Sequence, residues 1–197
     1  MTPEIVEAIS ADLREAVFRF RYDVYVREMH RPQKDADHER GRIEDPLDAN
    51  AHLFAARDPM SGRIVGTVRG NIVADATLGL YENLYGLASL SPAERRVTSM
   101  TTRLMIERGR RGSMLALHLA AALFERGIAL NVETDYIDCN AHLLPFFEHL
   151  GYRRLRMIHH PDYGGVTLMR LDVGDVAHLR RVGSPLAAVH ERAARVA

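Results

Sequence analysis

Residues 103–120 read RLMIERGRRGSMLALHLA, and this stretch decides how the chain is expected to fold. Its first residues suit a strand, a turn rich in arginine and glycine follows, and the apolar pattern after the turn favours a helix. The first turn of a helix carries unpaired N–H groups and the positive end of the helix dipole. Because glycine lets a ligand approach the backbone closely, the stretch predicts a site for a pyrophosphate or a phosphopantetheine arm.

The turn offers this site three arginines in addition to its backbone donors. It matches neither the dinucleotide pattern G-x-G-x-x-G nor the P-loop pattern G-x-x-x-x-G-K-[ST], and a basic turn before a helix can also be ordinary solvated capping. Both interpretations stay open from the turn alone. The residues expected to hold the phosphate are Arg108, Gly109, Arg110, Arg111, Gly112 and Ser113.

Length and composition indicate a single domain. The chain has 197 residues, 47% of them hydrophobic, which is ample for one packed core. Its 26 basic and 26 acidic residues balance, so no overall field recruits nucleic acid or an anionic membrane. We therefore expect one domain over residues 1–197, with no nucleic-acid partner.

The sequence also lacks the usual marks of export. The first ten residues, MTPEIVEAIS, have no positively charged start followed by an apolar run, and no stretch of about 18 uninterrupted apolar residues occurs. Cys139 is the only cysteine, which excludes a disulfide within the chain and is compatible with a reducing compartment. We expect a cytoplasmic protein without stable membrane insertion.

Strand and helix patterns continue on both sides of the opening stretch, and residues 30–50 form a long polar loop. Asn140 is placed to cap a helix, and Gly127 and Gly151 are placed to end helices. Two strand–helix–strand units in the second half indicate an α/β sheet covered by helices. The predicted strands are 4–9, 51–57, 64–73, 97–106, 128–134, 152–158 and 165–173, and the predicted helices are 11–29, 81–87, one starting at 91–94, 113–126, 140–150 and a tail after 175.

The second half of the chain resembles the acyl-CoA-binding half of the GNAT superfamily. Residues 140–152, NAHLLPFFEHLGY, are similar to that superfamily's N-x-x-x-x-x-F-Y-E-x-x-G-F ending, and they follow the expected strand, Arg/Gly turn, helix and strand. In RGRRGS the glycine after the first arginine's x-x comes one residue later than in the superfamily's usual turn, R-x-x-G-x-G/A. The resemblance implies an α/β (α+β) fold of one GNAT-like domain, with a mixed, mostly antiparallel sheet, a central splayed parallel strand pair and helices on both faces.

In that fold, pantetheine lies between the splayed strands, and a backbone N–H of the exposed edge receives the thioester oxygen. The resemblance places Leu104, Met105 and Ile106 on this edge, with Met105 as a catalytic candidate; plain core positions are the alternative for these apolar residues. It also places Asn140 and Phe147 at the donor. The superfamily often has a tyrosine at the position of Phe147 that protonates the leaving thiolate, so here either another group does this or the thiolate leaves unaided.

A narrower likeness covers nearly the whole chain. Four short motifs, FRYDVYVREM (20–29), EDPLD (44–48), GTVR (66–69) and TRLM (102–105), occur in the order found in acyl-homoserine-lactone synthases and FeeM-type N-acyl amino acid synthases. Three more, HPDYGG (160–165), LMRL (168–171) and SPL (184–186), resemble the end of the FeeM-type enzymes alone. Both families join a fatty acyl group from acyl carrier protein, or sometimes CoA, to an amine. The acceptor is an amino acid in the FeeM-type enzymes and S-adenosylmethionine in the lactone synthases.

Two differences from the lactone synthases favour the FeeM-type enzymes, whose acceptor is an amino acid. The lactone synthases characteristically carry an early tryptophan and a glutamate three residues before the arginine that matches Arg103, whereas this chain has no tryptophan and has Met100 at that position. The resemblance also implies an acceptor pocket in which an arginine binds the acceptor's carboxylate, with an internal salt-bridge network as the alternative. The matching residues are Arg21, Asp45, Asp48, Arg69 and Arg103.

Two residues are candidates for taking a proton from the acceptor amine. Glu133 faces the same crevice from the next strand if the predicted register is right, and His142, near a helix start, carries an imidazole suited to proton transfer. A surface or structural role is the alternative for each. Cys139 would be a nucleophile only with His142 as its partner, and the chain contains neither an H-x-x-x-H nor a C-x-x-C pattern, so no metal is expected.

These expectations combine into one leading function and two alternatives. The leading function is transfer of a long-chain acyl group from acyl carrier protein or CoA, a phosphopantetheine thioester, to the α-amine of an amino acid or related small amine. Residues 1–100 would form the acceptor side, 101–174 the donor side and 175–197 a helical tail. The alternatives are an acetyl-CoA-dependent N-acetyltransferase of a small amine or protein, and a non-catalytic module that binds acyl thioesters.

Overall fold

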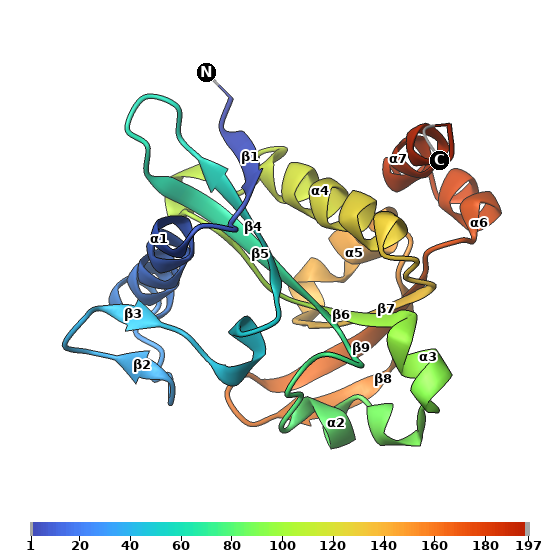
Figure 1. Ribbon diagram of the computed structural model, residues 1–197, viewed down its shortest axis with the longest axis horizontal. Coiled ribbons are helices and arrows are strands. Elements are labelled where there is room, and N and C mark those ends of the chain that lie inside the picture. Colours follow the sequence, from blue (N-terminus) through green and yellow to red (C-terminus); the bar gives the residue numbers. More distant parts are fainter. Residues whose placement is uncertain (1, 196–197) are drawn as a thin grey trace. The chain divides into compact units, whose positions relative to one another are not determined.

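A seven-stranded mixed sheet organises the computed structural model, which describes residues 2–195 (Figure 1). The strand order is β1-β4-β5-β6-β7-β9-β8, and β2 and β3 form a separate two-stranded ribbon. β6 and β7 are parallel, whereas β1–β4, β4–β5, β7–β9 and β8–β9 are antiparallel, which confirms the predicted fold class. The strands are β1 Glu4–Glu7, β2 Ala36–Asp37, β3 Arg42–Ile43, β4 His52–Arg57, β5 Ile64–Ile72, β6 Thr98–Ile106, β7 Thr134–Cys139, β8 Arg153–His160 and β9 Gly164–Asp172.

The chain forms two compact units, and β5, β6 and α4 each contribute residues to both. Unit 1 comprises Met1–Gly70 and Arg103–Leu123, and unit 2 comprises Asn71–Thr102 and Phe124–Ala197. No helix in the described part of the chain is long and apolar enough to cross a membrane. The α-helices are α1 Ala11–Tyr22, α2 Tyr81–Leu84, α3 Pro92–Arg96, α4 Leu115–Ala129, α5 Leu144–Leu150, α6 Val176–Arg181 and α7 Leu186–Ala193.

In unit 1, the helix predicted over residues 11–29 begins as α1 and continues as a π-helical stretch over Asp23–Glu28. The Ser10 side chain caps α1 by accepting a hydrogen bond from the Leu13 N–H at 3.3 Å. Val17 and Phe20 are buried on the face of α1 that enters the core. The length of the helical segment was therefore predictable, whereas its widened last part was not.

The polar loop predicted over residues 30–50 contains the β2–β3 ribbon and a capped 3₁₀ turn, Pro46–Asp48. Asp45 accepts a hydrogen bond from the Leu47 N–H at 3.0 Å, and Asp48 accepts one from the Asp45 N–H at 2.9 Å. This reciprocal capping box holds both carboxylates at the same end of the turn.

The opening stretch folds as predicted into strand, turn and helix. The end of β6 leads into a 3₁₀ turn at Arg108–Arg110, and α4 then packs on β5. The helix can approach closely because Gly66 has no side chain: a Cβ there would lie 2.9 Å from Ile106 Cδ1 and 3.1 Å from Leu119 Cδ1.

In unit 2, two predictions around Gly127 are wrong. The helix α4 does not stop at Gly127 but runs to Ala129, and the strand predicted over residues 128–134 instead starts at Thr134. The helix ends in a Schellman motif with Asn131 in the left-handed conformation, φ 57°. The Val132 N–H donates to the Gly127 carbonyl at 2.9 Å and the Asn131 N–H to the Ile128 carbonyl at 3.0 Å, so asparagine rather than glycine ends this helix.

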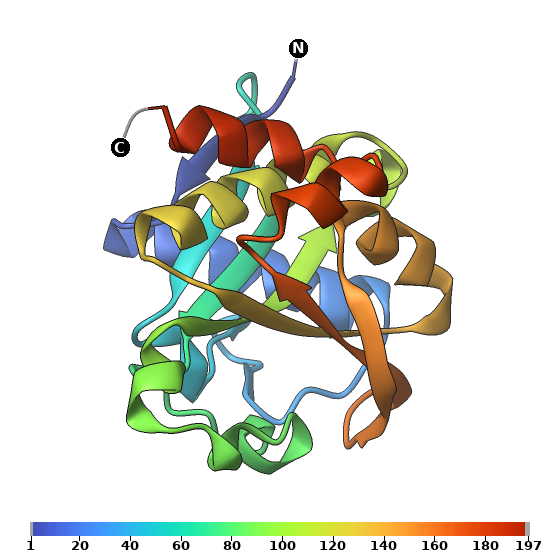
Figure 2. The same cartoon turned by 90° about the vertical axis from the view of Figure 1, so that its right-hand side faces the viewer.

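The rest of unit 2 follows the predicted order. The segment predicted as a helix over residues 140–150 starts as a 3₁₀ turn, Ala141–Leu143, and becomes α5, which ends at Gly151 with φ 109°. Asn140 occupies the capping position, but its side chain makes no capping hydrogen bond. Figure 1 shows α2 beside β8, and Figure 2 shows α6 and α7 next to one another.

Candidate functional site

The five residues expected at the acceptor pocket form one connected ion-pair cluster in unit 1. Asp48 accepts from Arg21 Nη1 at 2.8 Å and from Arg69 Nη1 at 3.0 Å. Asp45 accepts from the same Arg69 nitrogen at 2.6 Å and from Arg103 Nη2 at 2.7 Å. The salt-bridge network left open as an alternative is thus present, and a role in binding the acceptor would be additional to it.

Four elements position the five members of this arginine–aspartate cluster. Arg21 lies in the last turn of α1, and Arg69 lies within β5, where a lone charge would be costly. The capped turn supplies both aspartates. Arg103, in β6, has an unusual positive φ of 53°, and its guanidinium lies 5.4 Å from the centroid of the Tyr25 ring.

Burial strengthens the electrostatic interactions among the charged groups of the cluster. The side chains of Arg21 and Asp48 have no exposed surface. Burial lowers the pKa of Arg21 to about 10, against the attraction of Asp48. Burial alone would raise the pKa of Asp45, but Arg69 and Arg103 outweigh it and lower the pKa to about 2. The pKa of Asp48 is also lowered, because Arg21 and Arg69 outweigh its desolvation.

The cluster has one more positive charge than negative charge, since three guanidinium groups face two carboxylates. It also has spare donors: Arg21 Nε and Nη2 are buried and have no hydrogen-bond partner in the described structure. A buried donor without a partner costs about 1–3 kcal/mol. The Phe18 ring, 5.3 Å from the Arg21 guanidinium carbon, offsets part of this cost. A cluster with this balance favours an anion such as a carboxylate.

The lowered pKa of Asp45 predicts a loss of stability in acid. Asp45 titrates near 3.8 when unfolded and at about 2 when folded, so its contribution is complete above pH 3.8 and is lost as the pH falls through about 2. The difference corresponds to about 2.5 kcal/mol. We expect urea unfolding between pH 6 and pH 2 to show this decline.

The matched control for this decline is Asp45→Asn, which removes the titrating group. Its free energy of unfolding is expected to be lower at neutral pH and to depend less on pH below 4. An acid decline equally steep in the wild type and in Asp45→Asn would contradict the assignment.

The arginines of the predicted phosphate turn are partly engaged within unit 1. Arg110 forms an ion pair with Asp58, and Arg111 pairs with Glu28 and donates through Nε to the Ile106 carbonyl at 3.1 Å. Arg108 is exposed. A phosphate bound here would therefore compete with two carboxylates for Arg110 and Arg111.

The backbone of the same turn is also partly used. The N–H groups of Arg110, Arg111 and Ser113 already donate to carbonyl groups inside the turn. The Ser113 hydroxyl donates to the Arg110 carbonyl at 2.7 Å and accepts from the Leu115 N–H at 3.3 Å. Gly109 and Gly112 face open space, because a Cβ on either would meet no atom within 4 Å. The turn leaves room for a ligand at its glycines.

The expected donor edge lies at the end of β6. Met105 and Ile106 are buried and Leu104 is partly buried against the core, and the Glu107 N–H that follows donates to the Val65 carbonyl at 2.9 Å. These side chains therefore have the core role that the sequence left open. Any role in donor binding would fall to their main chain.

In unit 2, the parallel ladder between β6 and β7 is short. It comprises the pairs Thr98–Thr134, Ser99–Asp135 and Met100–Tyr136, although β7 continues to Cys139. A parallel pair whose ladder ends within the strand is what the predicted splayed pair requires. The last pair of the ladder is Met100 with Tyr136.

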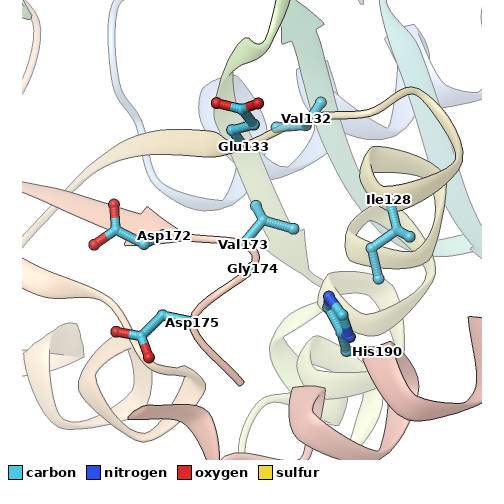
Figure 3. Close-up of a pocket in the computed structure, with 8 residues that line it drawn as sticks. All are labelled: Ile128, Val132, Glu133, Asp172, Val173, Gly174, Asp175 and His190. Atoms are coloured by element: carbon cyan, nitrogen blue, oxygen red, sulfur yellow. The ribbon is translucent and has the colours of Figure 1, made fainter. Parts of the chain in front are cut away.

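Glu133 does not lie where its predicted role requires. It precedes β7, is exposed, and its N–H donates to the Val97 carbonyl at 2.7 Å, so it lies at the paired end of the ladder. Because α4 extends to Ala129, β7 begins later in the sequence than predicted, and Glu133 therefore precedes the strand instead of lying within it. Glu133 is one of the residues that line a cavity of about 330 Å³, together with Asp172, Asp175 and His190. Figure 3 shows these lining side chains.

The other candidates of unit 2 divide between surface and core. His142 is exposed in the 3₁₀ turn before α5. Phe147 is buried, and its ring packs edge to face on Tyr152 at 5.7 Å, so it acts as a core residue. Burial and the neighbouring Asp138 raise the pKa of the Cys139 thiol to about 11, which argues against a nucleophilic role.

Sequence reasoning missed a half-buried polar group on β7. Asp138 accepts a hydrogen bond from the Tyr85 hydroxyl at 3.0 Å, and His160 lies against Tyr81 and Tyr163 in the same unit. The alternating pattern of β7 gave no sign of it. The HPDYGG motif was the one available signal, because it contains His160 and Tyr163. Among the residues described, no group of three His, Cys, Asp or Glu side chains is suited to hold a metal.

Comparison with known structures gives the same fold. The CoA-dependent acyl-homoserine lactone synthase BjaI, solved with MTA, is 21% identical over 98% of each chain, with a TM-score of 0.71. FeeM, an N-acyl amino acid synthase from uncultured soil microbes, is 12% identical over 94% of this chain and 98% of its own, with a TM-score of 0.67. The AHL synthase LasI is 14% identical over 87% and 91%, with a TM-score of 0.66.

The sequence itself matches one family model. No curated protein matches the chain. The model described as N-acyl amino acid synthase FeeM matches residues 16–172, which is most of the sequence. This chain therefore belongs to the FeeM family of N-acyl amino acid synthases and is a GNAT-type N-acyltransferase.

Proposed function

We propose that this protein transfers a long-chain fatty acyl group from acyl carrier protein or CoA to the α-amine of an amino acid. The amine attacks the thioester directly, and no acyl-enzyme forms. The observation that carries the proposal is the arginine–aspartate cluster, whose surplus positive charge suits the carboxylate that every amino acid acceptor brings. Arg103, 10% exposed, is the member best placed to meet it.

The short parallel ladder supports the donor half of the proposal. Because β7 runs on beyond Tyr136, its main chain there can pair with the amide groups of a pantetheine arm. The Arg/Gly turn of unit 1 is proposed to meet the phosphate end of the donor and the acidic surface of a carrier protein. Arg108 is its principal cation, since Arg110 and Arg111 already hold carboxylates.

The decisive experiment offers the protein several donors at once. Purified protein is incubated with acyl-CoA and acyl-carrier-protein thioesters of different chain lengths and an equimolar pool of amino acids, and the products are identified by mass spectrometry. Long-chain N-acyl amino acids are expected. Acetylated products alone would indicate an N-acetyltransferase instead, and the absence of any product would contradict acyl transfer to amino acids.

The phosphate turn is tested by reversing the charge of Arg108. We expect Arg108→Glu to weaken donor binding about tenfold, or roughly 1.4 kcal/mol, with an unchanged melting temperature, because the exposed side chain contributes little to folding. Calorimetric titration with dodecanoyl-CoA at fixed salt measures the change. Arg181→Glu, the same change on an exposed arginine of α6, should leave binding unaltered. Equal affinities for Arg108→Glu and the wild type would remove the turn from the donor site.

A further inference from the structure

We propose that Asp138 takes the proton from the acceptor amine and that Tyr85 positions it, beside a group of ring side chains that includes His160. The assignment rests on the acyl-transfer function proposed above and supplies its general base. Asp138, Tyr85 and His160 all belong to unit 2. Glu133 and His142, the candidates from the sequence, are exposed.

The three residues come together on one face of the sheet. Asp138 pairs across the strands with Leu168 of β9, and Leu168 pairs with Arg156 of β8. Alternate residues of a strand share a face, so His160, four residues after Arg156, lies on the same face as Asp138. The helix α2 contacts β8 and brings Tyr81 and Tyr85 to this face.

The position of Asp138 along β7 suits it to act on a bound substrate. It comes two residues after Tyr136, the last residue that pairs with β6. It therefore lies on the stretch of β7 proposed to face the donor arm. Its side chain is half-buried, so a ligand can still reach it. Met100, opposite Tyr136, is apolar and cannot move a proton.

Hydrogen bonds hold the carboxylate and its neighbours in place. The Tyr85 hydroxyl, buried with its ring, donates to Asp138 Oδ2 at 3.0 Å. The Asp162 N–H donates to His160 Nδ1 at 3.1 Å, so the proton of a neutral imidazole is on Nε2, 3.4 Å from the Tyr81 hydroxyl. The His160 ring also stacks on Tyr163 at 4.4 Å. The ring cannot turn without breaking these contacts.

The charges around Asp138 fit a proton acceptor. Burial raises its pKa, which brings the carboxyl closer to the range in which it can accept and release a proton, while Tyr85 and His160 act in the opposite direction. Burial also raises the pKa of Tyr85 well above 10, so this hydroxyl keeps its proton and remains a donor. Further titratable groups nearby are Tyr81 on α2, Tyr136 on β7, whose ring centroid lies 6.5 Å from that of Tyr85, and Cys139, whose raised pKa keeps it neutral. The residue of β9 that pairs with Asp138 is the apolar Leu168.

A second carboxylate on the same strand, Asp135, is a useful contrast because it is buried. Asp135 lies opposite Ser99 within the paired part of β7 and accepts hydrogen bonds from Ser99 and from the buried Tyr152 hydroxyl, the latter at 2.6 Å. Its side chain faces the other side of the strand and is almost fully enclosed. Asp135 therefore has a structural role, and Asp138 is the carboxylate that remains accessible.

The proposed step conserves atoms and charge. Asp138 accepts one proton from the acceptor ammonium, and the resulting neutral amine attacks the thioester carbonyl. The new C–N bond forms as the C–S bond breaks, and the leaving thiolate takes the second amine proton to become a thiol. Asp138 then releases its proton to water, so each turnover yields an amide, a thiol and one proton.

The test compares variants in the conversion of dodecanoyl-CoA with an equimolar pool of amino acids. Asp138→Asn is nearly isosteric and is expected to lower kcat/KM by about 10²–10⁴-fold, with donor affinity within about twofold of the wild type. Asp12→Asn makes the same substitution at an exposed position of α1 and should retain full activity. A kcat/KM for Asp138→Asn within threefold of the wild type would overturn the assignment.

The positioning role of Tyr85 has its own measurement. Its hydrogen bond stabilises the carboxylate form of Asp138, so Tyr85→Phe should raise the pKa of Asp138 and move the acidic limb of the kcat/KM profile to higher pH. If Asp138→Asn fails to fold, Tyr85→Phe still tests whether Asp138 is the proton acceptor. An unmoved acidic limb would count against Asp138, whereas a wild-type protein that makes no N-acyl product would overturn acyl transfer itself.

Discussion

Replacing Asp48 with alanine is expected to lower the free energy of unfolding by about 3–5 kcal/mol, because it removes one partner of a fully buried ion pair. Asp48 is the only carboxylate that meets Arg21 in the described structure, and it shares Arg69 with Asp45. Without it, Arg21 and Arg69 would face each other in the core with one carboxylate between three guanidinium groups. Urea unfolding at neutral pH, with thermal melting as a second measurement, would show the loss.

The matched control for this result is Asp37→Ala. Asp37 also pairs with an arginine, Arg40 at 3.8 Å, but both side chains are exposed. Exposed pairs contribute about 0–1 kcal/mol, so the control should change little. The double variant Asp48→Leu/Arg21→Met removes both charges. Its loss of unfolding free energy should therefore be smaller than the sum of the losses for Asp48→Leu and Arg21→Met measured singly. A loss below 1 kcal/mol for Asp48→Ala would show that the cluster is not a folding determinant.

Replacing Gly151 with alanine is expected to cost about 2–5 kcal/mol for two separate reasons. Gly151 ends α5 at φ 109°, a conformation that costs a residue with a Cβ about 1–2 kcal/mol. A Cβ there would also overlap the side chain of Leu179 and lie 3.3 Å from Leu171 Cδ1. Both leucines are fully buried, so the core must shift, at a further cost of about 1–3 kcal/mol.

Gly183→Ala separates the two contributions. Gly183 is left-handed too, with φ 67°, but a Cβ there would meet no atom within 4 Å. It should therefore show the backbone cost alone. The difference between the two variants, measured by urea unfolding, gives the packing cost at Gly151. If both variants lose the same free energy, the contact with Leu179 has no energetic weight.

Much of the fold could be predicted from sequence because its local signals agree with its tertiary structure. The strand, basic turn and helix around residues 103–120 formed as expected, and Gly151 ended α5. The failure at Gly127 has a plain cause: glycine is tolerated inside a helix, and the actual stop, Asn131, is a weaker signal than glycine. That single error displaced the predicted strand and gave Glu133 the wrong surroundings.

The site was less predictable because it depends on pairings between distant residues. The resemblance grouped Arg21, Asp45, Asp48, Arg69 and Arg103, but only coordinates show which carboxylate each arginine meets. The partners of Arg110 and Arg111 are 52 and 83 residues away in sequence, so no local pattern could reveal that they are engaged. Asp138 was missed for the same reason, because Tyr85 and His160 come from other elements.

Because Cys139 is buried, the chain is convenient for site-specific labelling through an introduced cysteine. Only a thiolate reacts readily with maleimides or iodoacetamide, and Cys139 is a buried residue, 4% exposed, whose Sγ lies 3.6 Å from Met169 Sδ. The native protein should therefore stay unmodified by such reagents. A cysteine introduced on the surface could then carry a fluorophore or spin label without first removing the natural one.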